Sequence, residues 1–313
     1  MMVRILLCTI IFYLSLFPVY AQKQPDSVVR VEGKYITLSE IVINNKLNVP
    51  AFITRVKNDT TFYKAFRTLH IVGFTALNDI RMVNKSGDIK ASLRSRIRQD
   101  RSKNCRSMKI LEESTTGDIY DNHRNFNYYT CEMYAGLFFT KDSICGEDNI
   151  VKGHEFTTSG VSGMEKHKQQ LKMLFFNPGR KIGIPLMGNK TALFEVNMSD
   201  KYDMDIDMAD YNKIHCYIFK IKAKENSKSD VVIDEMTTWF NEKTFEIVAR
   251  KYSLSYDAGV YDFNVQMEVE MTKFDNYLLP SLIRYNGNWK AIFKKRERGI
   301  FTATLFDFNK SPK

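Results

Sequence analysis

The spacing of apolar residues changes along the chain, and each change predicts a different element. After Pro50, two segments place their apolar residues on one helix face, which predicts two helices. Those residues are Phe52, Ile53 and Val56 in the first segment and Phe62, Phe66 and Leu69 in the second. Residues 71–83 and 89–99 instead alternate between apolar and polar around a turn at 85–88, which predicts a β hairpin.

The middle of the chain mixes further strands with helices. Residues 37–43, 106–114 and 125–130 have the composition of strands, and the apolar stretch 132–140 predicts a short helix. Ser162 and Glu165 have the spacing of a capping box, and an Asn-Pro-Gly sequence at 177–179 stops a helix. We therefore expect a longer helix over 163–176.

The C-terminal third predicts nearly continuous antiparallel sheet, with turns at 241–243 and 286–288. Its expected strands are 214–224, 231–240, 244–256, 261–273, 278–285 and 289–308. The whole pattern predicts an α+β fold, in which a large curved antiparallel sheet, an incomplete β-barrel, packs against a few helices. We expect one domain over 37–308, a flexible arm at 22–36 and a tail at 309–313.

Composition and the N-terminus place the protein outside the cytoplasm. The chain has 313 residues, of which 44% are hydrophobic and 13% aromatic, enough for one sizeable core. Residues 1–21 resemble a secretory signal, with a basic start, an apolar centre and a small-residue cleavage site between Ala21 and Gln22. We expect an exported protein of the periplasm or outer membrane, with peripheral or no membrane contact.

The net charge is +10, and a basic chain often binds nucleic acid, but export of the protein argues against that partner. Arg94, Arg96 and Arg98 share one face of a predicted strand, because successive side chains alternate sides. Two interpretations are open. These arginines pair with an acidic strand face formed by Asp203, Asp205 and Asp207, or they bind an anionic headgroup; a solvated charged face is the simpler reading of the stripe.

Four cysteines remain after signal cleavage, and an oxidising compartment allows three complete pairings of Cys105, Cys131, Cys145 and Cys216. Spacing does not choose among them, and we adopt Cys105 with Cys145. No C-x-x-C occurs, and the five histidines lack metal-ligand spacing. The acidic run at 203–207 opens like a calcium loop, but Met208 stands where glycine is required. We predict no metal, no cofactor and, because no catalytic signature occurs, no enzyme.

Several aromatic residues occur in local pairs that fill a core or line an apolar cavity. Those we select as candidate ligand-binding residues are Phe138, Phe139, Phe175, Trp239 and Phe240.

Residues 231–241, the segment 244–256 and the alternating strand 261–271 together resemble the strand-turn-strand signature of the outer-membrane lipoprotein-sorting superfamily. The resemblance lies mainly in residues 231–308. It implies an incomplete barrel capped by helices, and an apolar ligand or a lipoprotein acyl chain as the partner. The alternative is a non-enzymatic structural or interaction module, which docks on another envelope protein through its sheet edge or basic strand.

Overall fold

The computed structural model describes residues 27–140, 142–151, 170, 172–184, 187–257, 262–290 and 295–310. The expected signal peptide, its cleavage site at Ala21 and Gln22, and residues 22–26 of the expected arm lie outside this part of the chain. Of the helix expected over 163–176, residues 170 and 172–176 are described, and they are helical.

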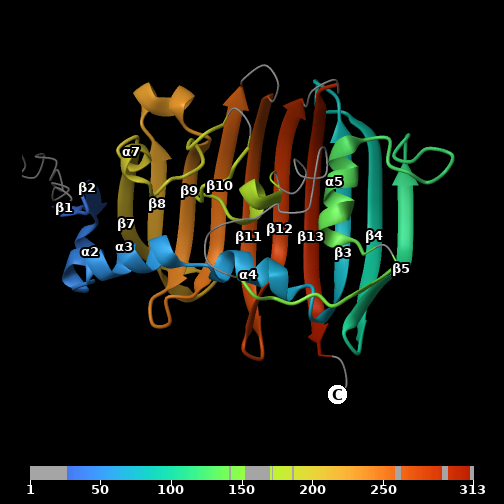
Figure 1. The fold of residues 1–313 in the computed structure, drawn as a ribbon, viewed down its shortest axis with the longest axis horizontal. Helices are drawn as coiled ribbons and strands as arrows, with labels where there is room; N and C mark the ends of the chain where they lie inside the picture. The colour runs from blue at the N-terminus through green and yellow to red at the C-terminus, as the bar shows by residue number, and fades with distance from the viewer. Residues whose placement is uncertain are drawn as a thin grey trace, which may run out of the picture.

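The described strands form one open sheet with the order β1-β2-β7-β8-β9-β10-β11-β12-β13-β3-β4-β5-β6 (Figure 1). Neighbouring strands are antiparallel except β2 and β7, which are parallel. The strands are β1 (Ser27–Val31), β2 (Lys34–Leu38), β3 (Gly73–Val83), β4 (Ile89–Ser102), β5 (Cys105–Thr116), β6 (Ser143–Cys145), β7 (Tyr202–Tyr211), β8 (Ile214–Ala223), β9 (Ile233–Asn241), β10 (Ile247–Asp257), β11 (Asp262–Phe274), β12 (Tyr277–Lys290) and β13 (Glu297–Asn309). The prediction of a large, mostly antiparallel sheet with few helices is confirmed.

Strand β13 joins two parts of the sheet that are distant in sequence. It pairs with β12 on one side and with β3 on the other (Figure 1). The last strand of the chain therefore lies between an early block, β3 to β6, and a late block, β7 to β12.

Helices cover one face of this sheet. They are α2 (Glu40–Asn44), α3 (Val49–Asn58), α4 (Thr61–Thr68), α5 (Tyr129–Phe138) and α7 (Val196–Ser199), with a 3-10 turn at Glu225–Asp230. Phe52 of α3 packs edge-on against Phe240 of β9, with ring centroids 5.4 Å apart. Tyr134 of α5 stacks on Phe301 of β13 at 4.9 Å. Since α3, α4 and α5 lie over the same face (Figure 1), the core is a single layer between helices and sheet.

The N-terminal segment differs from the expected loose arm. Residues 27–38 form the β1–β2 hairpin, and residues 37–43, expected as one strand, divide between β2 and α2. Strand β2 owes its place to parallel pairing with β7, in which Ile36 opposes Met204. A partner so far along the chain leaves no local sequence signal.

Residues 125–130 do not form the expected strand. A single isolated bridge joins Tyr120 to Phe126, and helix α5 begins at Tyr129. The alternation in this segment was too short to distinguish a strand from a loop that leads into a helix.

The expected turn at 286–288 is also wrong, because β12 runs without interruption from Tyr277 to Lys290. Asn-Gly-Asn has turn composition, but Gly287 has a packing role in the strand. A Cβ atom at this position would collide with the hydroxyl end of the Tyr285 ring, which folds over the glycine. Tyr285 is buried and lies 4.7 Å from Tyr134 of α5, centroid to centroid.

The proposed pairing of the basic and acidic strand faces is wrong as well. Seven strands separate β4 from β7 in the sheet. The two faces find nearer partners instead: Asp207 lies 3.5 Å from Lys220 on β8, and Arg96 lies 3.4 Å from Glu112 on β5. Sequence alternation predicts the face on which a charge lies, but not which strand is its neighbour.

We expect Gly287→Ala to lower the free energy of unfolding by about 1–3 kcal/mol, because the added methyl group overpacks the Tyr285 ring. The matched control is Gly183→Ala, where a Cβ atom meets no atom within 4 Å. Urea unfolding measured by circular dichroism compares the two variants with the wild type. Equal stabilities of both variants would contradict the packing role of Gly287.

Candidate functional site

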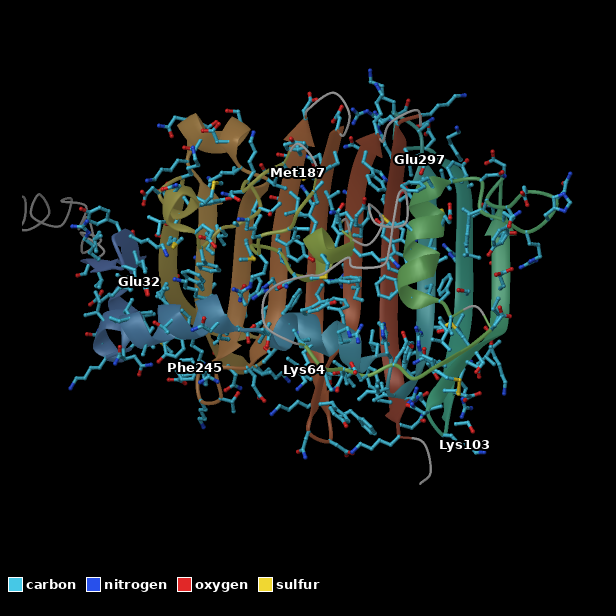
Figure 2. All side chains as sticks on the ribbon, in the orientation of Figure 1. Glu32, Lys64, Lys103, Met187, Phe245 and Glu297 are labelled. Atoms are coloured by element: carbon cyan, nitrogen blue, oxygen red, sulfur yellow. A yellow bond between two sulfur atoms is a disulfide. The ribbon has the colours of Figure 1, made fainter. Side chains whose placement is uncertain are left out.

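Helix α5 is held at its N-terminus by a side chain from the sheet. The carboxylate of Glu297, on β13, accepts hydrogen bonds from the backbone nitrogens of Tyr129 and Thr130, at 3.0 and 2.8 Å. Trp289 of β12 donates its indole N–H to the Thr130 hydroxyl at 2.8 Å. Figure 2 shows Glu297 beside the start of α5. An acidic group at a helix N-terminus accepts hydrogen bonds from the free N–H groups and interacts favourably with the positive end of the helix dipole. These contacts fix the position of α5 on the sheet.

Two pockets lie beside α5. The first, which we call the apolar pocket, has a volume of about 750 Å³ between α5 and strands β4 and β5. Its apolar lining residues are Ile97, Met108, Ile110, Phe126, Met133, Ala135, Phe139 and Ile144. Polar residues also line it: Ser95, Glu113, Tyr120, Arg124, Asn125, Glu132, Thr140 and Lys172.

The second pocket, which we call the polar pocket, has a volume of about 330 Å³ and lies between α4 and α5. Its charged and polar lining residues are Tyr63, Arg67, His70, Gln99, Arg106, Glu147 and Lys172. Apolar residues also line it: Phe66, Leu69, Phe74, Phe138, Met173 and Phe176. Gly136 and Lys172 line both pockets, and Lys172 Nζ donates a hydrogen bond to the Gly136 carbonyl at 3.2 Å. The two residues therefore form the boundary between the pockets.

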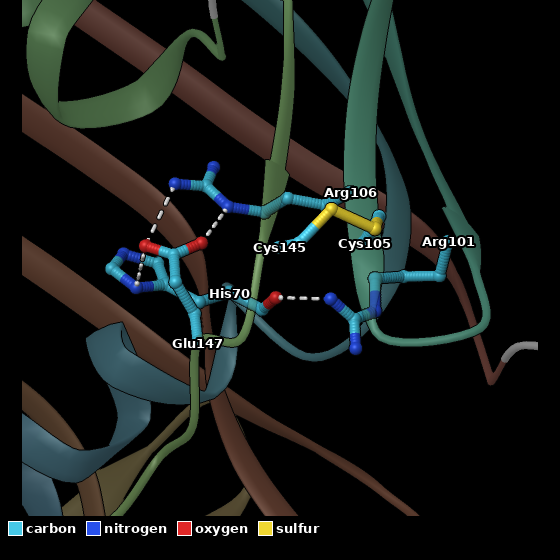
Figure 3. The surroundings of a disulfide bond; sticks show 6 residues. All are labelled: His70, Arg101, Cys105, Arg106, Cys145 and Glu147. Carbon is cyan, nitrogen blue, oxygen red and sulfur yellow. Dashed lines mark hydrogen bonds and ion pairs between the residues drawn. A yellow bond between two sulfur atoms is a disulfide. The ribbon is translucent and has the colours of Figure 1, made fainter.

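Glu147 is the centre of a charged cluster in the polar pocket (Figure 3). Arg106 contacts both of its carboxylate oxygens, with Nη2 3.2 Å from Oε1. His70 Nδ1 lies 3.1 Å from the same Oε1 on the other side, although the alignment is not that of a hydrogen bond. The carboxylate therefore lies between a cation and an imidazole.

Burial and the neighbouring positive charges together determine the protonation of this cluster. It lowers the pKa of His70 to about 4, and the positive charges of Arg106, Arg67 and Lys172 act in the same direction. Burial acts to raise the pKa of Glu147, but hydrogen bonding from Arg106 and the surrounding positive charge outweigh it, so this pKa is lowered. At neutral pH, His70 is therefore neutral and Glu147 ionised.

The amide of Gln99 connects this cluster to three elements. Its nitrogen donates to the carbonyl oxygens of Leu69 and Val72, both at 2.7 Å, in the turn between α4 and β3. Its oxygen accepts from Arg106 at 3.2 Å and from the Thr140 hydroxyl, just after α5, at 3.3 Å. The side chain is buried with all four hydrogen-bonding positions used.

A disulfide joins Cys105 to Cys145, which oppose each other on β5 and β6. It holds the segment that follows Cys145, and with it Glu147, against Arg106 (Figure 3). Cys131 and Cys216 are free thiols and buried, and burial raises the pKa of both. A buried thiol with a raised pKa is a poor nucleophile. The disulfide indicates folding in an oxidising, extracytoplasmic compartment.

The aromatic residues selected from the sequence lie in different places. Phe138 lines the polar pocket and Phe139 the apolar pocket. Phe175 packs against Tyr285 in the core, and Phe240 lies beneath α3. Trp239 points to the opposite face of the sheet from Phe240, where it contacts Tyr211 with ring centroids 5.0 Å apart.

The arginines selected as a headgroup site lie on the sheet face opposite the helices, and each has an acidic partner. Arg94 lies 3.5 Å from Asp79, and Arg98 lies 3.0 Å from Asp100. Arg94 and Arg96 also line a surface pocket of about 410 Å³, together with Glu112.

Most residues of the two pockets had no sequence signal. Met133, His70, Gln99 and Glu147 occur singly, in four different segments, and only the tertiary fold brings them near α5. The Cys105–Cys145 pairing was the one clue, because it places residue 147 next to residue 106.

Among the described residues, no group of three or more His, Cys, Asp or Glu side chains could hold a metal ion. No helix in the described ranges is both long and apolar enough to cross a bilayer.

No protein-family model matches the sequence, and no curated protein is similar to it. Three of the solved structures that match are each only distantly similar to this chain. A DUF1329 family protein from Desulfovibrio piger matches with a TM-score of 0.25 and 10% identity, over 80% of this chain and 94% of that one. A domain named for outer membrane lipoprotein sorting, from Vibrio parahaemolyticus, matches with a TM-score of 0.27 and 7% identity, over 78% and 88%. Lipovitellin matches with a TM-score of 0.26 and 8% identity, over 78% of this chain and 26% of that one. Similarity this distant identifies neither a family nor a ligand.

The His70 pKa predicts acid sensitivity. Between pH 6.5 and 4 the unfolded chain binds a proton at residue 70 that the folded protein does not, so stability falls as the pH falls through this range. Between pH 8 and pH 5 this residue lowers the free energy of unfolding by about 2 kcal/mol. We expect His70→Gln to reduce the stability difference between the two pH values by that amount, measured by urea unfolding. Replacement of the exposed His123 by Gln should leave the difference unchanged; an unchanged difference in His70→Gln would refute the assignment.

The disulfide closes a loop with a sequence separation of 40 that contains all of α5. We expect Cys105→Ser combined with Cys145→Ser to lower the free energy of unfolding by about 4 kcal/mol, through the larger entropy of the unfolded chain. Reductant should destabilise the wild type by a similar amount and leave the double variant unchanged. Identical unfolding midpoints for oxidised and reduced wild type would show that the bond adds no stability.

Proposed function

We propose that this protein binds an apolar ligand, such as the acyl chain of a lipid or lipoprotein, in the apolar pocket beside α5. The observation that carries the proposal is the pocket itself. Its volume of about 750 Å³ is within the range of about 300–1,000 Å³ common to small-molecule sites. Met108 and Met133 line it, and the flexible thioether side chain adapts to ligands of irregular shape.

The energetics favour a chain over a compact polar ligand. Each methylene group removed from water contributes about 0.8 kcal/mol, so a chain of about ten methylenes contributes about 8 kcal/mol before the cost of association. The opposite end of the ligand would meet the polar side chains at the boundary of the pocket. Binding of this kind needs no reacting group, and we propose a carrier or binding protein rather than an enzyme.

We also propose that the protein acts in the periplasm or at the outer membrane. The disulfide between Cys105 and Cys145 and the signal-like residues 1–21 support an exported protein. A lipid chain exposed to water in such a compartment requires a protein that encloses it.

Native mass spectrometry of residues 22–313, purified from a periplasm without detergent, tests the proposal. We expect a stoichiometric mass increase, which organic extraction identifies as an acyl-bearing molecule. Ala135→Phe should abolish this increase, because the added ring fills the apolar pocket from α5. Ala209→Phe, at an exposed position of β7, is the matched control and should retain the ligand.

An apo mass that stays unchanged after incubation with lipids would refute the proposal. Retention of the ligand by Ala135→Phe would place the ligand elsewhere on the protein.

One observation favours the second candidate, an interaction module. Among the described strands, β6 pairs only with Cys105–Ser107, so the rest of β5 has an open edge. Ile110 and Leu111 on this stretch are 59% and 47% exposed. Open edges bind strands of partner proteins. Under this alternative, capture from envelope extracts recovers a partner that Leu111→Lys no longer binds.

A further inference from the structure

We infer that the ligand is a single-chain anionic amphiphile, whose carboxylate or phosphate headgroup binds in the polar pocket while its chain occupies the apolar pocket. The inference rests on the proposed function and adds the chemistry of the headgroup.

The first argument for an anionic headgroup is the charge of the polar pocket. Its lining contains three cations, Arg67, Arg106 and Lys172, and one carboxylate, Glu147, and a second carboxylate, that of Asp148, is ion-paired with Arg67. Arg106 is largely buried and already directs its donors to Glu147, Gln99 and Thr140. It therefore contributes charge to the pocket and fixes the carboxylate in place. The positive excess of the lining attracts an anion.

The second argument is the arrangement of hydrogen-bond donors on Arg67. Arg67 donates from Nη2 to the backbone and side chain of Asp148, at 2.9 and 3.1 Å, which holds its guanidinium at the pocket wall. Its Nε is buried and has no hydrogen-bond partner among the described residues. A buried donor without an acceptor costs free energy, so a movement of this guanidinium that brings Nε to an oxygen atom of a headgroup would be favoured.

The third argument is the glycine at the boundary between the two pockets. Glycine inside a helix is less favourable than alanine by about 1 kcal/mol, so Gly136 in α5 weakens the helix that bears it. A Cβ atom at this position would meet only Lys172 Nζ, at 3.8 Å. Since Gly136 lines both pockets, its missing side chain leaves space for a ligand that extends from one pocket into the other.

The experiment compares four dodecyl probes of equal chain length on delipidated protein, residues 22–313, by calorimetry at low salt. They are dodecanoate, dodecyl phosphate, dodecanol and dodecyltrimethylammonium. We expect the two anions to bind at least tenfold more tightly than dodecanol, and the cation to bind most weakly. Tighter binding of dodecanoate indicates a fatty acid, and tighter binding of dodecyl phosphate indicates a phosphate amphiphile with one chain.

Two variants locate the headgroup. Arg67→Gln should weaken binding of both anions about tenfold and leave dodecanol unchanged, whereas the matched control Arg94→Gln, on the opposite sheet face, should change neither. Gly136→Leu should remove the preference for anions while it maintains or raises the melting temperature, because leucine favours the helix. This second variant tests the boundary without loss of the fold.

Equal affinity for all four probes, or a preference for anions that survives both Arg67→Gln and Gly136→Leu, would overturn the inference and leave the proposed function intact. Failure of every probe to bind would refute both. The proposed function and the inference are both supported if Ala135→Phe abolishes binding and Arg67→Gln changes only the preference for anions.

Discussion

The buried amide of Gln99 is the interaction on which the arrangement around α5 depends. It joins the turn after α4 to the side chain of Arg106 and to Thr140 at the end of α5, and each of its hydrogen-bonding positions has a partner. A buried amide that lost one partner would cost free energy, so the hydrogen bonds of this network are expected to form or break together. Because α5 is fixed by Thr140 at one end and by Glu297 at the other, the spaces on its two sides keep their shapes.

The two pockets differ because the elements that enclose them differ. Strands β4 and β5 present alternating apolar side chains such as Ile97 to one side of α5. On the other side, the turn after α4 and the segment after Cys145 bring His70 and Glu147 together, since neither segment is part of a regular strand there. A single helix thus separates two pockets that both have apolar walls, and the smaller of the two also contains the charged cluster around Glu147. This division is the physical basis for assigning one ligand to both.

The sequence predicted what depends on local periodicity and missed what depends on distant partners. Strict alternation along 261–271 located β11, and helical spacing located α3 and α4. The neighbours of the acidic and basic strand faces were wrong because alternation contains no information on strand order. Gly287 was misread as a turn residue because its role is set by the ring of Tyr285. The pockets were missed because their polar residues occur singly, and the selected Trp239 even points away from the core.

The central position of β13 has a consequence for how the protein assembles. A chain that is made or exported from its N-terminus presents β3 long before Gly299–Asn309 arrives to pair with it. Until then, the edges of β3 and β12 both stay open, and open edges invite aggregation. Contacts between such distant segments also slow folding, because a large loop must close before they form. The final third of the chain is therefore required to complete the pairing of the first.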